Sequence, residues 1–172
     1  MKTKFQRRLT PDLSALSAAA VAKIESPRFG TLMVDPSHVI EFPRGLVGLE
    51  HCRRFALFHP ERKRVGHFLL QSMDDPALAF HISDPEQFGL AYKIVLSDEE
   101  AADLAIRGAE RDVAKSAARL AVAVILIKES PDQPVRANLN GPLVINLDTR
   151  RGLQHVFVRL DYNVTSSPTE KP

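Results

Sequence analysis

The chain has 172 residues, 44% of them hydrophobic, which is enough to bury one sizeable core but too few for two substantial domains. Its single cysteine, Cys52, excludes an intramolecular disulfide, and it has no apolar run long enough to span a membrane. The formal charge of +2 is uneven: residues 1–27 hold five basic and two acidic side chains, so residues 28–164 are close to neutral, which excludes the broad basic face of a general nucleic-acid binder.

Residues 1–27 form a basic N-terminal leader, which we expect to be partly helical or disordered. Pro11 and Asp12 interrupt the apolar run that a secretory signal requires, and a short amphipathic helix capped by Thr10 fits the pattern better. We therefore expect a soluble protein that stays in the reducing cytoplasm, where a lone thiol is usual. Residues 165–172, rich in Ser and Pro, indicate a disordered tail.

Short strand-like runs follow from residue 28 onward, separated by Pro, Gly, Asn and Asp, which is typical of an antiparallel sandwich or barrel. In the first half of the chain we predict strands at Arg28–Val34, His38–Phe42, Arg54–Phe58, Gly66–Met73 and Leu78–Ser83. Within the last of these, Leu78, Phe80 and Ile82 alternate with smaller or polar residues and should face the core.

The second half contains the one clear helix signal. Ser97 is followed three residues later by Glu100, which is a capping box, and the spacing predicts a helix of about three turns that reaches Ile106 before Gly108 ends it. A further strand, Tyr92–Leu96, should precede this helix.

The remaining elements close the fold. Leu120–Ile127 is apolar at successive positions, so both of its faces should be buried and it should be the central strand. Leu143–Leu147 and Leu153–Tyr162 should then pair as a closing hairpin. The predicted fold is all-β, an antiparallel, β-barrel-like domain over residues 28–164 with one or two minor helices.

The sequence contains no Gly-rich phosphate loop, no nucleophile elbow and no pair of histidines at metal-ligand spacing, so we predict no catalytic residue, no metal site and no cofactor. One alternative is a small hydrolase built on Cys52, which lies among basic neighbours. Another is a nucleic-acid-binding barrel that uses the leader and the basic hairpin tip Arg62–Arg64. Asp74 and Asp75 could hold a divalent ion, but beside a proline they are more typical of a turn.

Three blocks of residues lie in order along the body. The first, IEFPRGLVGLE, spans residues 40–50, and the second runs from Phe68 to Phe88 around the motif DDP. The third, ANLNGPLVIN, spans residues 137–146, with Gly152 and Gln154 beyond it. Together the blocks resemble the signatures of the FliW family of flagellar assembly factors. Because their glycines, asparagines and proline suit turns, we expect most of these motif residues to hold the fold.

The resemblance implies a small β-barrel-like protein that acts as a partner switch. Such a protein binds the translational repressor CsrA and inhibits it allosterically, which relieves repression of flagellin mRNA. It binds flagellin in exchange for CsrA. A switch of this kind requires differential binding rather than chemistry, which agrees with the lack of a catalytic motif. We expect a monomer with no direct contact to nucleic acid or membrane.

The partner contacts are predicted from loop groups that combine apolar and polar character, because binding hot spots need an apolar anchor inside a polar rim. These groups are Phe42, Leu46, Leu49, Phe88, Asn138 and Leu139. A free sheet edge is the rival site, where a terminal segment of flagellin would add as a strand or dock as a helix.

Overall fold

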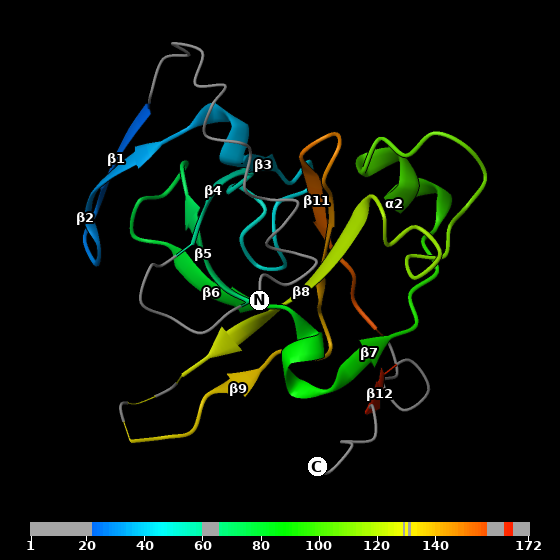
Figure 1. Ribbon diagram of the computed structural model, residues 1–172. Coiled ribbons are helices and arrows are strands. Elements are labelled where there is room, and N and C mark those ends of the chain that lie inside the picture. The colour runs from blue at the N-terminus through cyan, green and yellow to red at the C-terminus, as the bar shows by residue number, and fades with distance from the viewer. Residues whose placement is uncertain (1–21, 60–65, 129, 131, 158–163, 167–172) are drawn as a thin grey trace.

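The computed structural model describes residues 22–157 and 164–166, with the exception of residues 60–65, 129 and 131 (Figure 1). Seven strands close into a barrel in the order β10-β11-β3-β4-β5-β6-β8, and β8 pairs back onto β10. These strands are β3 (Val39–Glu41), β4 (Arg54–Phe58), β5 (His67–Ser72), β6 (Ala79–Ser83), β8 (Leu120–Ile127), β10 (Leu143–Asn146) and β11 (Arg151–Gln154). The predicted all-β, barrel-like fold is confirmed, and its neighbours are antiparallel except for β11 and β3, which run parallel.

Smaller elements surround the barrel. In Figure 1 a hairpin of β1 and β2 lies on one side, and a short helix, α2, lies on the other. The elements outside the barrel are β1 (Ala22–Ser26), β2 (Gly30–Val34), β7 (Leu90–Tyr92), β9 (Arg136–Ala137), β12 (Val164–Ser166), α2 (Asp98–Asp103) and the 3-10 helices η2 (Pro36–His38) and η3 (Pro85–Phe88). Among the described residues, no helix has both the length and the apolar character needed to cross a membrane.

The central strand β8 is apolar throughout because both of its faces are covered. Ala121, Ala123 and Ile125 belong to the core cluster inside the barrel. Leu120 belongs to a second cluster on the outside, where it packs with residues such as Leu104 of the segment that follows β7. Since β8 pairs with β6, β9 and β10, the predicted position of this strand is confirmed. Strand β6 also follows its predicted pattern, because Ile82 is fully buried and Leu78 and Phe80 pack against the inner cluster.

Helix α2 begins as predicted but is shorter than predicted. The Ser97 hydroxyl accepts a hydrogen bond from the Glu100 N–H, and the Glu100 carboxylate accepts one from the Ser97 N–H, so the capping box is complete. The helix ends at Asp103, because Ala105 takes a positive φ of 52° and the Ile106 N–H reaches back to the Ala101 carbonyl. This turn directs Leu104 onto the outer wall of the barrel, so the prediction of three turns was wrong.

The boundaries drawn at residues 27/28 and 164/165 are too narrow. Strand β1 lies within the predicted leader and pairs with β2, and Ile24 of β1 packs against Ala56 of the barrel. Strand β12 extends to Ser166, within the predicted tail, and pairs with β7. Strand β1 forms a local hairpin with β2, whereas β12 pairs with a strand about seventy residues earlier in the chain. The rest of the leader, with its predicted helix, lies outside the described residues.

Three strands are shorter than predicted at an end. The strand predicted at Arg28–Val34 begins at Gly30, and the one predicted at Tyr92–Leu96 is replaced by β7, which ends at Tyr92. The pairing of the closing hairpin is confirmed, although β11 runs from Arg151 to Gln154 and residues 158–162 lie outside the described part.

Replacing Ala105 by glycine should raise the free energy of unfolding by roughly 0.5–1 kcal/mol, because glycine adopts a positive φ without strain. The same substitution at the exposed Ala102, inside α2, should lower it by about 1 kcal/mol. Urea denaturation of the two variants measures both values. A loss of stability on Ala105→Gly would contradict the left-handed turn.

Candidate functional site

The loop between β3 and β4, residues 42–53, folds into the mouth of the barrel. Phe42, Leu46 and Cys52 are 0%, 3% and 0% exposed and belong to the same core cluster as the inner strand residues. Gly45 makes this path possible: its φ is 69°, and a Cβ there would lie 2.6 Å from the Glu50 Cα. The buried residues of the first motif block therefore close the barrel, whereas Arg44 and Val47 of the same block remain exposed.

The third block is bonded to the first. The Val47 N–H donates to the Gln154 side-chain oxygen at 3.0 Å, and the Gln154 amide nitrogen donates to the Gly141 carbonyl at 3.1 Å. Gly152 lies directly against the Phe42 ring, since a Cβ at this glycine would be 2.6 Å from the Phe42 Cζ. Two segments that are about a hundred residues apart are thus locked together by one glutamine and one ring.

The second block is bonded to the start of β4 through Asp74. One carboxylate oxygen of Asp74 accepts the N–H groups of Arg53 and Arg54, both at 2.8 Å, and the other accepts the Arg54 guanidinium. Burial by itself raises the pKa of Asp74, but these donors outweigh it and the pKa lies below its usual value. Asp75 accepts the Ala77 N–H, so the prediction of a turn former is confirmed for Asp75, whereas the carboxylate of Asp74 bonds Arg53 and Arg54 instead of its own turn.

The six predicted partner contacts have different environments. Phe42 and Leu46 are buried, so the prediction that they are exposed anchors is wrong; their apolar side chains fill the barrel mouth. Leu49 is half-buried against the same cluster. Of the six, Phe88 in η3 is 46% exposed and keeps the geometry of an anchor.

Asn138 and Leu139 are half-buried, and their backbone groups make hydrogen bonds within the fold. The Asn138 N–H donates to the Ile125 carbonyl, and the Leu139 carbonyl accepts the Tyr92 hydroxyl at 3.0 Å. Burial raises the pKa of Tyr92 to about 12, so this donor keeps its proton throughout the physiological range. These two residues hold the segment that follows β9 in place.

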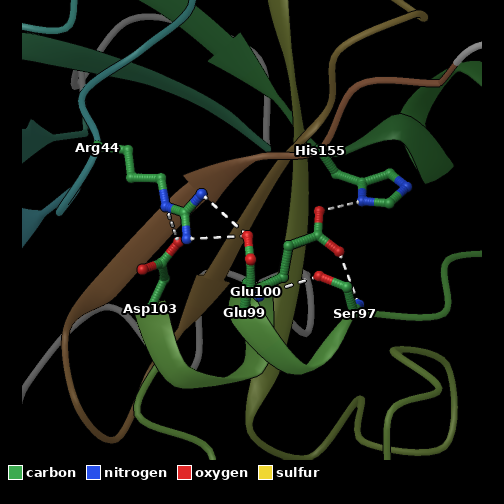
Figure 2. A network of polar contacts seen from close by, with 6 residues as sticks. All are labelled: Arg44, Ser97, Glu99, Glu100, Asp103 and His155. Carbon is green, nitrogen blue, oxygen red and sulfur yellow. Dashed lines mark hydrogen bonds and ion pairs between the residues drawn. The ribbon is translucent and has the colours of Figure 1, made fainter.

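The sequence reasoning missed a charged surface beside the closed mouth, which we call the α2 face and define as α2 together with residues 43–47. Arg44 contacts Asp103 at 2.6 Å and Glu99 at 3.4 Å, and His155 lies 2.6 Å from Glu100 (Figure 2). Arg44, Glu100 and Asp103 line a hollow of about 280 Å³. The polar side chains of α2 are thereby fixed relative to the first and third blocks.

The α2 face is acidic and has an apolar point. It holds four acidic residues, all in α2, and one basic residue, Arg44, whereas the whole body is nearly neutral. Val47, at the tip of the mouth loop, is 66% exposed. Its position between two glycine turns was visible in the sequence, but its exposure depends on how the loop enters the barrel.

The structure bears on the three alternatives that the sequence left open: a hydrolase, a metal site and a nucleic-acid-binding barrel. Cys52 is fully buried, so the hydrolase hypothesis loses its nucleophile. Within the part of the chain that the structure describes, no three His, Cys, Asp or Glu side chains are grouped so that they could hold a metal ion. The basic tip Arg62–Arg64 and most of the basic leader lie outside the described residues.

Comparisons with known proteins agree with this architecture. The model of the family described as "FliW protein" matches residues 23–167. The chain is 48% identical over 147 residues to a flagellar assembly factor FliW of Azoarcus sp. (strain BH72), covering 83% of this chain and 95% of that protein. It is 36% identical over 144 residues to the flagellar assembly factor FliW of Chromobacterium violaceum, covering 81% and 95%. A crystal structure of the flagellar assembly factor FliW superposes with a TM-score of 0.66 at 27% identity, covering 87% of this chain and 100% of that one.

Replacing Gly152 by alanine should lower the free energy of unfolding by roughly 1–3 kcal/mol, because the new methyl group would overlap the Phe42 ring in a closely packed core. In the double variant with Phe42→Leu the ring is absent. The loss of stability in this double variant should therefore be smaller than the sum of the losses in the two single variants, by about 1 kcal/mol or more. Denaturant unfolding of both single variants and the double variant measures this. Strict additivity would contradict the ring contact.

Replacing Asp74 by alanine should cost about 1–3 kcal/mol at neutral pH, because the N–H groups of Arg53 and Arg54 would lose their acceptor. The pKa of Asp74 is lowered in the folded state, so its stabilising contribution is complete above the unfolded pKa of about 3.9 and is lost as the pH falls below it. The difference from wild type should therefore stay constant down to about pH 5 and shrink as the pH falls below about 4. The exposed Asp132→Ala provides the baseline, and an unchanged difference at acid pH would exclude the charged form as the stabilising species.

Proposed function

This chain belongs to the FliW family of flagellar assembly factors, and we propose that it works there as a protein-binding switch between a CsrA-type translational regulator and flagellin. In the proposed cycle it holds the regulator, which relieves repression of flagellin mRNA, until newly made flagellin binds in exchange. It acts in the cytoplasm as a monomer and by stoichiometric binding. Such coupling needs only that the two partners bind one protein with opposed preferences.

The match over residues 23–167 carries this proposal, since it covers the barrel together with β2, β7 and β12. Of the three blocks by which the chain resembles the family, the first and third are bonded to each other at the barrel mouth, and the second is bonded to the start of β4. A protein with its characteristic residues inside the fold offers its partners a shaped surface, and a rigid barrel keeps that surface preorganised.

The α2 face supports the regulator half of the proposal. An RNA-binding regulator carries basic surface, and an acidic patch attracts such a partner and accelerates its association. Glu99 is 78% exposed, so its charge is available to a partner even though Arg44 lies nearby. Val47 supplies the apolar anchor beside these charges.

Reversing the charge of Glu99 should weaken binding of the purified regulator by about fivefold at low salt, because the positive side chain repels a basic partner. Glu25→Lys is the matched control, since it makes the same charge change on the exposed side of β1, away from α2 (Figure 1). Calorimetric titration of the full-length variants gives both affinities. Equal losses in the two variants would assign the effect to net charge and exclude the α2 face as the docking surface.

The switch itself is tested by competition. Flagellin added to a preformed complex with labelled regulator should displace the regulator, and the reciprocal experiment should show the same coupling factor. The full chain is the bait for capture from the native lysate, because a fragment starting at residue 28 would lack β1. Capture of neither protein would refute the proposal, and capture of ribonuclease-sensitive RNA would favour the nucleic-acid alternative.

A further inference from the structure

A second hollow, of about 640 Å³, lies on the outer wall of the barrel, between η2, β3, the start of β4 and the turn that joins β10 to β11. Basic side chains predominate in its lining. The charged or titratable residues that line it are Glu41, His51, Arg53, Arg54, Asp74 and Arg150. This surface is separate from the α2 face, because none of these residues belongs to α2 or to residues 43–47.

Arg150 has an unusual backbone for its residue type. It takes a positive φ of 56°, a conformation that glycine or asparagine adopts at lower cost in a hairpin turn. Its carbonyl accepts the Glu41 N–H at 2.9 Å, which fixes the turn against β3. A strained backbone that carries a long charged side chain is a feature of ligand-binding sites.

The guanidinium of Arg150 is also incompletely satisfied. Its Nη1 atom is buried and has no hydrogen-bond partner within the described part of the chain. Burial lowers the pKa of Arg150, and the charge of Asp35 opposes this effect. A buried donor without an acceptor costs free energy, and an oxyanion is the group that best satisfies a guanidinium.

The neighbouring carboxylates are already engaged. Asp74 pairs with Arg54 at 2.8 Å, and Glu41 faces Arg151 at 3.9 Å. Among the described residues, neither Arg53 nor Arg150 has a carboxylate within ion-pair distance. Two guanidinium groups therefore line one hollow without a paired anion.

We propose that this hollow binds a carboxylate group of a protein partner, with Arg150 and Arg53 as the contacting residues. The planar guanidinium matches a carboxylate through two parallel hydrogen bonds. Glu41 and Asp74 flank the site and would repel the successive phosphates of a nucleic acid, whereas a single carboxylate avoids them. This inference rests on the proposed function in one respect: the molecule that carries the carboxylate is taken to be a protein.

The test is an NMR titration of the full-length protein at constant ionic strength, with the arginine Nε–H resonances as the readout. The probe is N-acetyl-glutamate methylamide, and its neutral isostere, N-acetyl-glutamine methylamide, is the ligand control. We expect saturable shifts at Arg150 and Arg53 with the glutamate probe and none with the glutamine probe. Arg150→Gly, which keeps the positive φ, should weaken binding by about tenfold or more.

Arg136→Gly in β9 is the control variant, since it removes the same charge from an exposed residue outside the hollow, and it should leave the affinity within twofold. Equal losses in the two variants, or shifts spread over many exposed basic residues, would overturn the proposal. Binding of a ten-nucleotide RNA at Arg150 in preference to the glutamate probe would overturn it as well. Capture of flagellin or regulator by the Arg150→Gly protein with unchanged affinity would refute this site while leaving the switch intact.

Discussion

The contact between the Phe42 ring and Gly152 is the constraint on which the barrel depends. It joins the end of β3 to β11, next to the one parallel pairing of the barrel, which consists of the single register pair Arg151 and Glu41. So short a ladder contributes little by itself, and packing across it must supply the rest. The absence of a side chain at Gly152 lets the ring lie against the backbone of β11 and complete the closure.

The same closure decides which residues remain for binding. Because Phe42, Leu46 and Cys52 occupy the barrel mouth, their side chains are inaccessible to a partner, and Arg44 and Val47 are left exposed beside them. Charged side chains lie on the outer surface beside the mouth, with a different predominant sign in two regions. Acidic groups gather along α2, and the guanidinium groups of Arg53 and Arg150 gather at the second hollow.

Strand β11 connects these two regions. Arg150 precedes its first residue and lines the cationic hollow. At its other end Gln154 binds the mouth loop, and His155 contacts Glu100 of α2. A strand whose position is set by the barrel core thus holds both proposed contact regions at a constant separation, which suits a protein that discriminates between two partners by surface shape.

The sequence alone determined the features that arise from neighbouring residues. The apolar run of β8, the alternation in β6 and the capping box at Ser97 have local causes, so their positions could be predicted. Exposure could not, because a loop phenylalanine and a core phenylalanine carry the same local pattern. Only the tertiary structure put Phe42 into the mouth, left Phe88 exposed and paired β12 with β7. The physical reason is that burial and strand pairing are settled between segments far apart in the chain, where hydrophobic contact and steric fit override local preference.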